Sequence, residues 1–145
     1  MRYLVTENRN DFVPLQNEIN CIVDFIDLQK LRLADNIRLK CEISGDFSDK
    51  KIGPLLLMPF IENAFKHGVN PDDDSNISIY IHANDHELKL HVENNKVSVN
   101  NETIGKSGLG LKNTKTRLQF LYPEKHVLKI TEDDNFYSVI LTLFF

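Results

Sequence analysis

This chain of 145 residues has few cysteines, no excess of basic residues and no long apolar run. Each of these features excludes a class of protein. The two cysteines, Cys21 and Cys41, have no second thiol or histidine at zinc-ligand spacing, so neither a disulfide framework nor a structural metal site is indicated. We therefore expect a reducing compartment. The formal net charge of -4 argues against a general nucleic-acid binder, because phosphate backbones are held mainly by excess Lys and Arg.

The chain also lacks the features of a membrane-spanning or secreted segment. No apolar stretch approaches the roughly 20 residues that cross a bilayer, and no charged-then-apolar signal peptide opens the sequence. What is present is 41% hydrophobic and 26% charged residues without a low-complexity tract. This composition predicts one globular domain with a real core, outside the membrane.

Hydrophobic spacing predicts helices and strands in an alternating but uneven order. The expected helices cover residues 14–35, 54–68 and 111–122, and the expected strands cover residues 36–44, 77–83, 87–94, 126–133 and 136–145. The last four strands form two pairs with short connections, which predicts two hairpins. This order favours an α+β fold, a mixed and mostly antiparallel sheet with helices on one face, over a doubly wound parallel sheet.

Residues 95–110, "NKVSVNNETIGKSGLG", show no apolar periodicity and predict a polar, glycine-bearing loop of a length that is usually functional. Part of it, "NNETIGKS", resembles a P-loop, but Asn100 replaces the first glycine of that motif. A P-loop also turns directly into a helix at its Lys-Ser pair, whereas "GLG" intervenes here. We therefore disfavour a P-loop.

The stretch "PFIENAFKHG", residues 59–68, predicts an amphipathic helix with an unusual polar face. That face brings together a carboxylate, an amide, an ammonium and an imidazole: Glu62, Asn63, Lys66 and His67. Considered alone, the helix favours a solvated surface with a Glu62 to Lys66 ion pair, which is worth only a few tenths of a kcal/mol. A functional site needs support from other segments of the sequence.

Three segments in order, "PFIENAFKHG", "HVENN" and "GKSGLGLKNTKTRLQFLYP", resemble the ATP-binding domain of sensor histidine kinases in the GHKL superfamily. The likeness is greatest to kinases of the LytS/YpdA type, in which an N box of the form P-x-x-E-N-A-x-K-H-G follows a helix ending in x-L-Q-x-x-R, here "DLQKLR". The resemblance runs from about residue 10 to the C-terminus. It implies a Bergerat-type two-layer α/β sandwich that binds ATP with Mg²⁺ and passes the γ-phosphoryl group to a histidine.

The resemblance assigns roles to the polar face of the N-box helix. Asn63 matches the asparagine that coordinates Mg²⁺ through its amide oxygen, a hard neutral ligand. Lys66 and His67 match the residues that contact the phosphate chain. Glu62 matches the catalytic acid, which either holds a water on the metal or helps to remove a proton from the accepting imidazole.

The two glycine boxes are implied to hold the rest of the nucleotide. Asn94 stands where most members carry an aspartate that accepts a hydrogen bond from the adenine amino group, and Lys96 stands where a glycine is usual. An asparagine carbonyl can still accept that bond. The second box is expected to open a helix whose free N–H groups face the phosphates, and residues 95–107 are expected to form the mobile ATP lid. The residues implied at the phosphates are Lys106, Ser107, Gly108, Leu109, Gly110, Leu111 and Asn113.

The resemblance also implies an organisation and a set of partners. Residues 1–34 are expected to be the last part of a dimerisation hairpin with its connection, and residues 35–145 the ATP-binding domain. The expected partners are ATP, a cognate response regulator and a second copy that pairs through upstream helices, with no nucleic acid. The full-length protein is expected in the bacterial plasma membrane, with this part in the cytoplasm.

Two other functions remain open, a GHKL module that binds nucleotide without catalysis and an anti-sigma-type serine kinase. The N-terminal helix argues against the free-standing serine kinase, which would not need it. His82, His86 and His91 are expected to be surface residues rather than zinc ligands, since strand alternation gives them no fixed ligand geometry.

The phosphate-accepting histidine of such kinases lies in an upstream helix, and the first histidine of this chain is His67, inside the N box. Phosphoryl transfer needs the acceptor nitrogen in line with the γ-phosphorus. We therefore predict that this chain binds nucleotide without phosphorylating itself, and that a separate fragment carrying the upstream helix restores transfer in trans. Incubation with γ-labelled ATP tests this, and an acid-labile, alkali-stable phosphate on this chain alone would show that the acceptor lies within it.

Overall fold

The computed structural model describes residues 12–33, 35–67, 74–95 and 101–145, with the backbone alone for residues 67 and 101–110. The helices are α2 (Leu15–Lys30), α3 (Met58–His67) and α4 (Asn101–Leu121). The strands are β1 (Val13–Pro14), β2 (Ile37–Gly45), β3 (Lys51–Ile52), β4 (Ser75–Ala83), β5 (Glu87–Asn95), β6 (His126–Glu132) and β7 (Phe136–Phe144). Among these residues no helix is both long enough and apolar enough to cross a bilayer.

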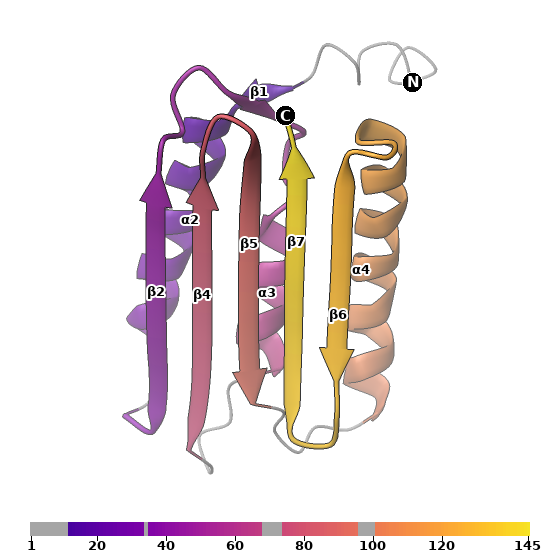
Figure 1. Ribbon diagram of the computed structural model, residues 1–145. Helices are drawn as coiled ribbons and strands as arrows, with labels where there is room; N and C mark the ends of the chain where they lie inside the picture. Colours follow the sequence, from indigo (N-terminus) through magenta and orange to yellow (C-terminus); the bar gives the residue numbers. More distant parts are fainter. Residues whose placement is uncertain (1–11, 34, 68–73, 96–100) are drawn as a thin grey trace, which may run out of the picture.

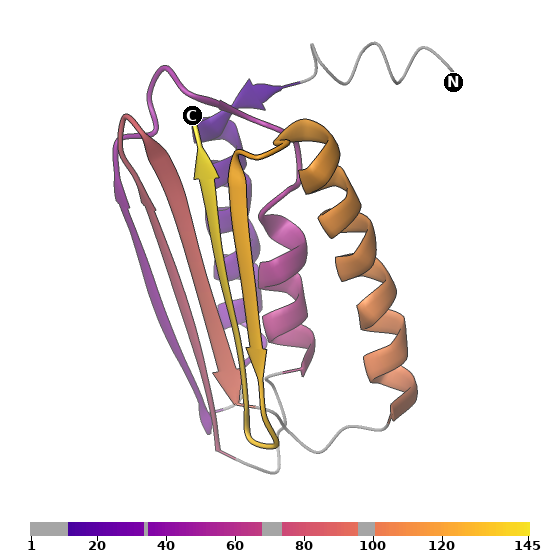
Figure 2. The same ribbon diagram turned by 45° about the vertical axis from the view of Figure 1, so that its right-hand side comes forward.

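The main sheet has five strands in the order β2-β4-β5-β7-β6. β2 runs parallel to β4 and the other neighbours are antiparallel, so the sheet is mixed and mostly antiparallel. The three helices cover one face and leave the other open (Figures 1 and 2). The predicted α+β architecture is therefore confirmed. The short pair formed by β1 and β3 was not predicted.

Alternation along the central strands produces the covered face. In β4, Ile77, Ile79 and Ile81 point toward the helices and are buried, while the residues between them point to the open face. The helices contribute the matching apolar side chains, and fully burying each large aliphatic one stabilises the fold by about 1.5–3 kcal/mol. The helical part of this core comprises Leu15, Ile19, Ile22, Ile26, Phe60, Ile61, Ala64, Phe65 and Leu118.

Helix α2 belongs to the same packed unit as the sheet. Pro14 occupies its N-cap position, just before the first turn, and the buried aliphatic residues of α2 lie within the single core cluster. Residues 12–33 therefore contribute to the core that the sheet shares with the other helices. The division of roles expected at residue 34 stays a prediction.

Helix α4 begins at Asn101, whereas the sequence predicted a loop up to residue 110 and a helix from residue 111. The prediction was wrong for residues 101–110 because it treated the glycines as breakers. A glycine inside a helix costs only about 1 kcal/mol relative to alanine, which propagation from an established helix can offset. Gly108–Leu111 consequently lie inside the helix and do not form its N-terminus. Residues 96–100 of the expected loop lie outside the described residues.

Gly45, at the end of β2, is a position where only glycine fits. Its φ is +104°, and an added Cβ would lie 2.1 Å from the carbonyl oxygen of Ala83. We predict that Gly45→Ala lowers the free energy of unfolding by more than about 1 kcal/mol in denaturant titration. Gly53→Ala is the matched control and should cost less, because its added Cβ would meet only the side-chain carbons of Leu121 and Leu56. Equal losses in both variants would contradict the assignment of strain to Gly45.

Candidate functional site

The three motif segments meet at one end of the molecule. The C-terminal end of α3, the C-terminal end of β5 and the N-terminal end of α4 all lie at the lower end of both views (Figures 1 and 2). α3 packs against β5 on one side and against α4 on the other. Segments far apart in the sequence are thus brought to one edge of the helical layer.

The N-box helix, α3, has one apolar and one polar face, as its sequence predicted. Its apolar face is buried in the core, and Glu62 and Lys66 on its other side are exposed. Asn63 lies between these environments with only 9% of its surface exposed. No ion pair within 4.0 Å joins Glu62 to Lys66 in the described part of the chain. The polar face is therefore not organised as a surface ion pair, and His67 ends the helix with its side chain outside the description.

Asn94 is the most unusual polar residue at this edge. It is 1% exposed, and its Nδ2 donates a hydrogen bond of 2.9 Å to the carbonyl oxygen of Asn95. Its Oδ1 is buried without a hydrogen-bond partner among the described residues. Leaving a buried acceptor unpaired costs about 1–3 kcal/mol, so such an atom calls for an explanation. An acceptor oriented by its own amide group fits a donor such as an adenine amino group.

The second glycine box is only partly placed. Lys106, Ser107, Gly108, Leu109 and Gly110 lie on the backbone of α4, and their side chains are outside the description. Leu111 is half-buried against the core and Asn113 is exposed. Their contact with phosphate stays a prediction.

The residues present fit a magnesium ion that is held mostly by other groups. Asn63 offers one hard amide oxygen at the enclosed side of α3. No group of three or more His, Cys, Asp and Glu side chains gathers to hold a metal within the described ranges. Mg²⁺ commonly keeps several waters and binds through substrate phosphates with one or two protein ligands, which matches this donor set.

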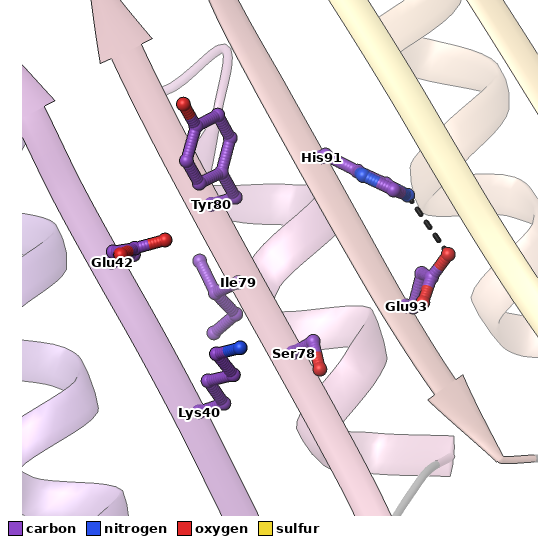
Figure 3. A pocket seen from close by; sticks show the side chains of 7 residues that line it. All are labelled: Lys40, Glu42, Ser78, Ile79, Tyr80, His91 and Glu93. Carbon is purple, nitrogen blue, oxygen red and sulfur yellow. Dashed lines mark ion pairs between the residues drawn. The ribbon is translucent and has the colours of Figure 1, made fainter.

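The open face of the sheet carries a separate, polar hollow of about 210 Å³ (Figure 3). It is lined by Lys40, Glu42, Ser78, Ile79, Tyr80, His91 and Glu93. There His91 Nε2 lies 3.0 Å from Glu93 Oε1 and 3.3 Å from Ser138 Oγ. Because the helices and Asn94 lie on the other face of the sheet, this hollow is separate from the residues implied to hold the nucleotide. The histidines expected at the surface are exposed or half-buried, and His82 bonds to Ser44 over 3.0 Å.

The sequence analysis did not predict a polar cluster at the opposite end of α3. Glu18 of α2, Arg117 of α4 and Tyr122, the residue after α4, all bond to the turn Gly53–Leu57, which leads into α3. One signal was available: Glu18 occupies a position on the apolar face of its helix, three residues after Leu15 and four before Ile22. An acid at a core position predicts a buried partner, although not which one.

Comparison with known proteins supports the kinase resemblance in sequence. No protein-family model matches the chain. It is 29% identical over 154 residues to the sensor protein kinase HptS of Staphylococcus aureus strain RF122, an alignment that covers 97% of this chain and 29% of HptS. With HptS of strain USA300 the identity is 35% over 92 residues, covering 63% of this chain and 17% of that protein. The chain thus spans less than a third of the length of these relatives.

The structural likeness extends over almost the whole chain. The nucleotide-free catalytic domain of histidine kinase ThkA superposes with a TM-score of 0.56 at 16% identity, covering 91% of this chain and 94% of that domain. ThkA in complex with the response regulator TrrA gives 0.58 at 15% identity, over 92% of this chain and 41% of ThkA. Full-length ShkA in complex with AMPPNP gives 0.62 at 14% identity, over 92% and 31%. This chain is homologous in sequence to sensor protein kinases, and its fold is that of the histidine kinase catalytic domain.

Proposed function

We propose that this chain is the ATP-binding catalytic module of a sensor histidine kinase, which passes the ATP γ-phosphoryl group to a histidine upstream of it. The observation that carries the proposal is the buried Oδ1 of Asn94, which has no hydrogen-bond partner among the described residues and lies at the end of the molecule where the C-terminal ends of α3 and β5 meet. Three facts about other proteins support it: the relative HptS is a sensor protein kinase, ShkA was solved with AMPPNP, and ThkA was solved with a response regulator.

Each residue of the site then has a distinct task. Asn94 Oδ1 accepts the adenine amino proton, and its Nδ2, held by Asn95, fixes the direction of that acceptor. Asn63 provides the amide oxygen for Mg²⁺, which when bound neutralises charge on the phosphates. Lys66, exposed one turn further along α3, adds a cation near the same phosphates, and His67 adds a donor. Glu62 is exposed beside them, where it can reach a water or the accepting imidazole.

The ATP lid is part of this proposal. For Gly108 and Gly110 to present free N–H groups to phosphate, residues 101–107 must leave the helical state when nucleotide binds. The three glycines at 105, 108 and 110 make that change easier, because each weakens a helix by about 1 kcal/mol relative to alanine. Lys106 and Ser107 then become available as additional donors.

Assembly and subtype follow from the same proposal. We place the chain among kinases of the LytS/YpdA type, in a full-length protein that pairs through upstream helices, lies in the bacterial plasma membrane and serves a cognate response regulator. A product stable to alkali and labile to acid distinguishes a histidine kinase from an anti-sigma-type serine kinase. If no phosphoryl group is transferred to an upstream helix, the chain is instead a module that binds nucleotide without catalysis.

The role of Asn63 is tested by calorimetry of ATP binding with and without Mg²⁺. Asn63→Ala should weaken binding in the presence of Mg²⁺ by roughly 10- to 100-fold and leave the weak Mg²⁺-free binding unchanged, because it removes a metal ligand only. Asn20→Ala is the matched control, since Asn20 is a helical asparagine that is exposed and bonds only to Gln16 among the described contacts. Mg²⁺-dependent affinity that survives Asn63→Ala would sink the metal assignment.

The role of Asn94 is tested by separating stability from base recognition. Asn94→Leu removes a buried unpaired acceptor together with one hydrogen bond, so the free energy of unfolding should change by less than about 1 kcal/mol. This variant should bind ATP about tenfold more weakly than the wild-type chain does. Its affinity for ATP should then equal the wild-type affinity for purine riboside triphosphate, which lacks the adenine amino group.

Asn95→Leu is the control for that comparison. Its Oδ1 accepts a hydrogen bond of 2.8 Å from the backbone of Asn76, so this variant should lose stability while still preferring ATP to purine riboside triphosphate. If Asn94→Leu keeps the wild-type preference between the two nucleotides, Asn94 does not read the base.

A further inference from the structure

The turn Gly53–Leu57 is held by side chains from two helices that are distant in the sequence. The N–H of Gly53 donates to the hydroxyl of Tyr122 over 3.3 Å, and the N–H of Leu55 donates to Glu18 Oε1 over 3.2 Å. Arg117 donates to the carbonyl oxygens of Pro54 over 2.7 Å and Leu55 over 3.5 Å. Glu18 comes from α2 and Arg117 from α4, and Tyr122 directly follows α4. The turn therefore joins all three helices.

One peptide group lies between opposite charges. The carbonyl of Pro54 and the N–H of Leu55 belong to the same peptide unit, and they point at the Arg117 guanidinium and the Glu18 carboxylate respectively. The dipole of this unit is thus aligned with both charges. No ion pair within 4.0 Å joins Glu18 directly to Arg117 in the described part of the chain, so the two charges act on each other through the peptide. Together they set which way it faces.

That orientation is strained. Leu55 has φ +57°, in the left-handed region that is unfavourable for a residue with a Cβ. Its own side chain is 57% exposed, so burial of Leu55 does not compensate. Leu56 and Leu57, by contrast, are fully buried. The turn accepts the strain because it buries the next two side chains and because Glu18 and Arg117 hold its peptide.

Glu18 is itself unusual for a side chain that is 4% exposed. Burial raises its pKa, while the amides of Leu55, Leu57 and Leu56 and the charge of Arg117 act in the opposite direction. Its second oxygen, Oε2, has no hydrogen-bond partner among the described residues. Burying a carboxyl group costs free energy unless hydrogen bonds or charges offset the cost. For Glu18 those contacts are with the turn.

The turn lies at the opposite end of α3 from the candidate site. α3 begins immediately after it, at Met58, and carries Asn63 in its second turn. Gly53 packs against Leu121 at the C-terminal end of α4, so the same turn fixes one end of both helices (Figure 2). In that view α4 leans away from the sheet toward its N-terminal end. The turn is thus at one end of α3 and α4, and the candidate site is at the other end of both helices.

We propose that Glu18 and Arg117 are positioning residues that lock the Pro54–Leu55 peptide in its strained orientation and thereby place α3, with Asn63, against α4 for nucleotide binding. This rests on the proposed function. Neither residue contacts nucleotide. Their effect is exerted through the turn, and it ties the placement of α2 to the geometry of the site.

The experiment compares Glu18→Gln and Arg117→Met with the same variants carrying Leu55→Gly. Each single variant should raise the Kd for Mg-ATP roughly fivefold or more and speed hydrogen exchange of the α3 amides relative to those of β4 and β5. Gln keeps the size of Glu18 but places an amide nitrogen where a carboxylate oxygen was, and Met keeps the length of Arg117 without its donors. Adding Leu55→Gly removes the strain that the two residues hold, so it should restore most of the lost affinity and protection.

Glu124→Gly is the matched control for the rescue. Glu124 also has a positive φ, +60°, in an exposed turn after α4, so this variant relieves strain elsewhere and should restore neither quantity. Unchanged Kd and unchanged α3 exchange in the single variants would overturn the proposal, as would equal rescue by Glu124→Gly. If the wild-type chain does not bind Mg-ATP, the proposed function fails, but exchange at α3 and its rescue by Leu55→Gly still decide whether the turn is locked in this way.

Discussion

Burial of a single face of the sheet is the constraint on which the rest of the molecule depends. Alternating aliphatic residues of β4, β5 and β7 all point to one side, and removing them from water is the main favourable contribution to folding. Three helices must therefore lie in one layer, side by side, with their polar faces outward or at their ends. In such a layer the helix ends are the places where functional side chains can gather. The candidate site and the turn at residues 53–57 occupy the two opposite ends.

Much of this arrangement could be predicted because its signals are local. The period-2 alternation of residues 75–83 and 87–95 marks both strands and the short connection between them. The amphipathic pattern of α3 separates its buried face from Glu62 and Lys66, but Asn63, expected on the polar face with them, is largely buried. Asn94 was expected to offer an acceptor at the end of β5. The structure adds that its oxygen is buried and has no partner among the described residues, which only three-dimensional packing can show.

What the sequence did not reveal depends on contacts between distant residues or on small energy differences. Glu18 reaches the turn across 37 residues and Arg117 across 63, and no periodic pattern records such a pairing. The two-residue strands β1 and β3 are too short to show alternation. The start of α4 was misplaced because glycine weakens a helix without forbidding it. The packing of the first helix against the sheet could not be read from its sequence, because amphipathic helices in a hairpin and in a sandwich have the same pattern.

The pairing of β5 with β7, rather than with β6, has a consequence for variation in this fold. Asn95 pairs with Phe136, so the two ends of the segment between them, which includes α4 and β6, are joined by the pairing of β5 with β7. The entropy lost on closing a flexible loop grows only with the logarithm of its length, about 0.6 kcal/mol for each doubling. The connection between β5 and α4 can therefore lengthen or shorten with little effect on the sheet. The segment proposed to cover a nucleotide can thus differ in length between related chains, while Asn94 and Asn63 keep their places in β5 and α3.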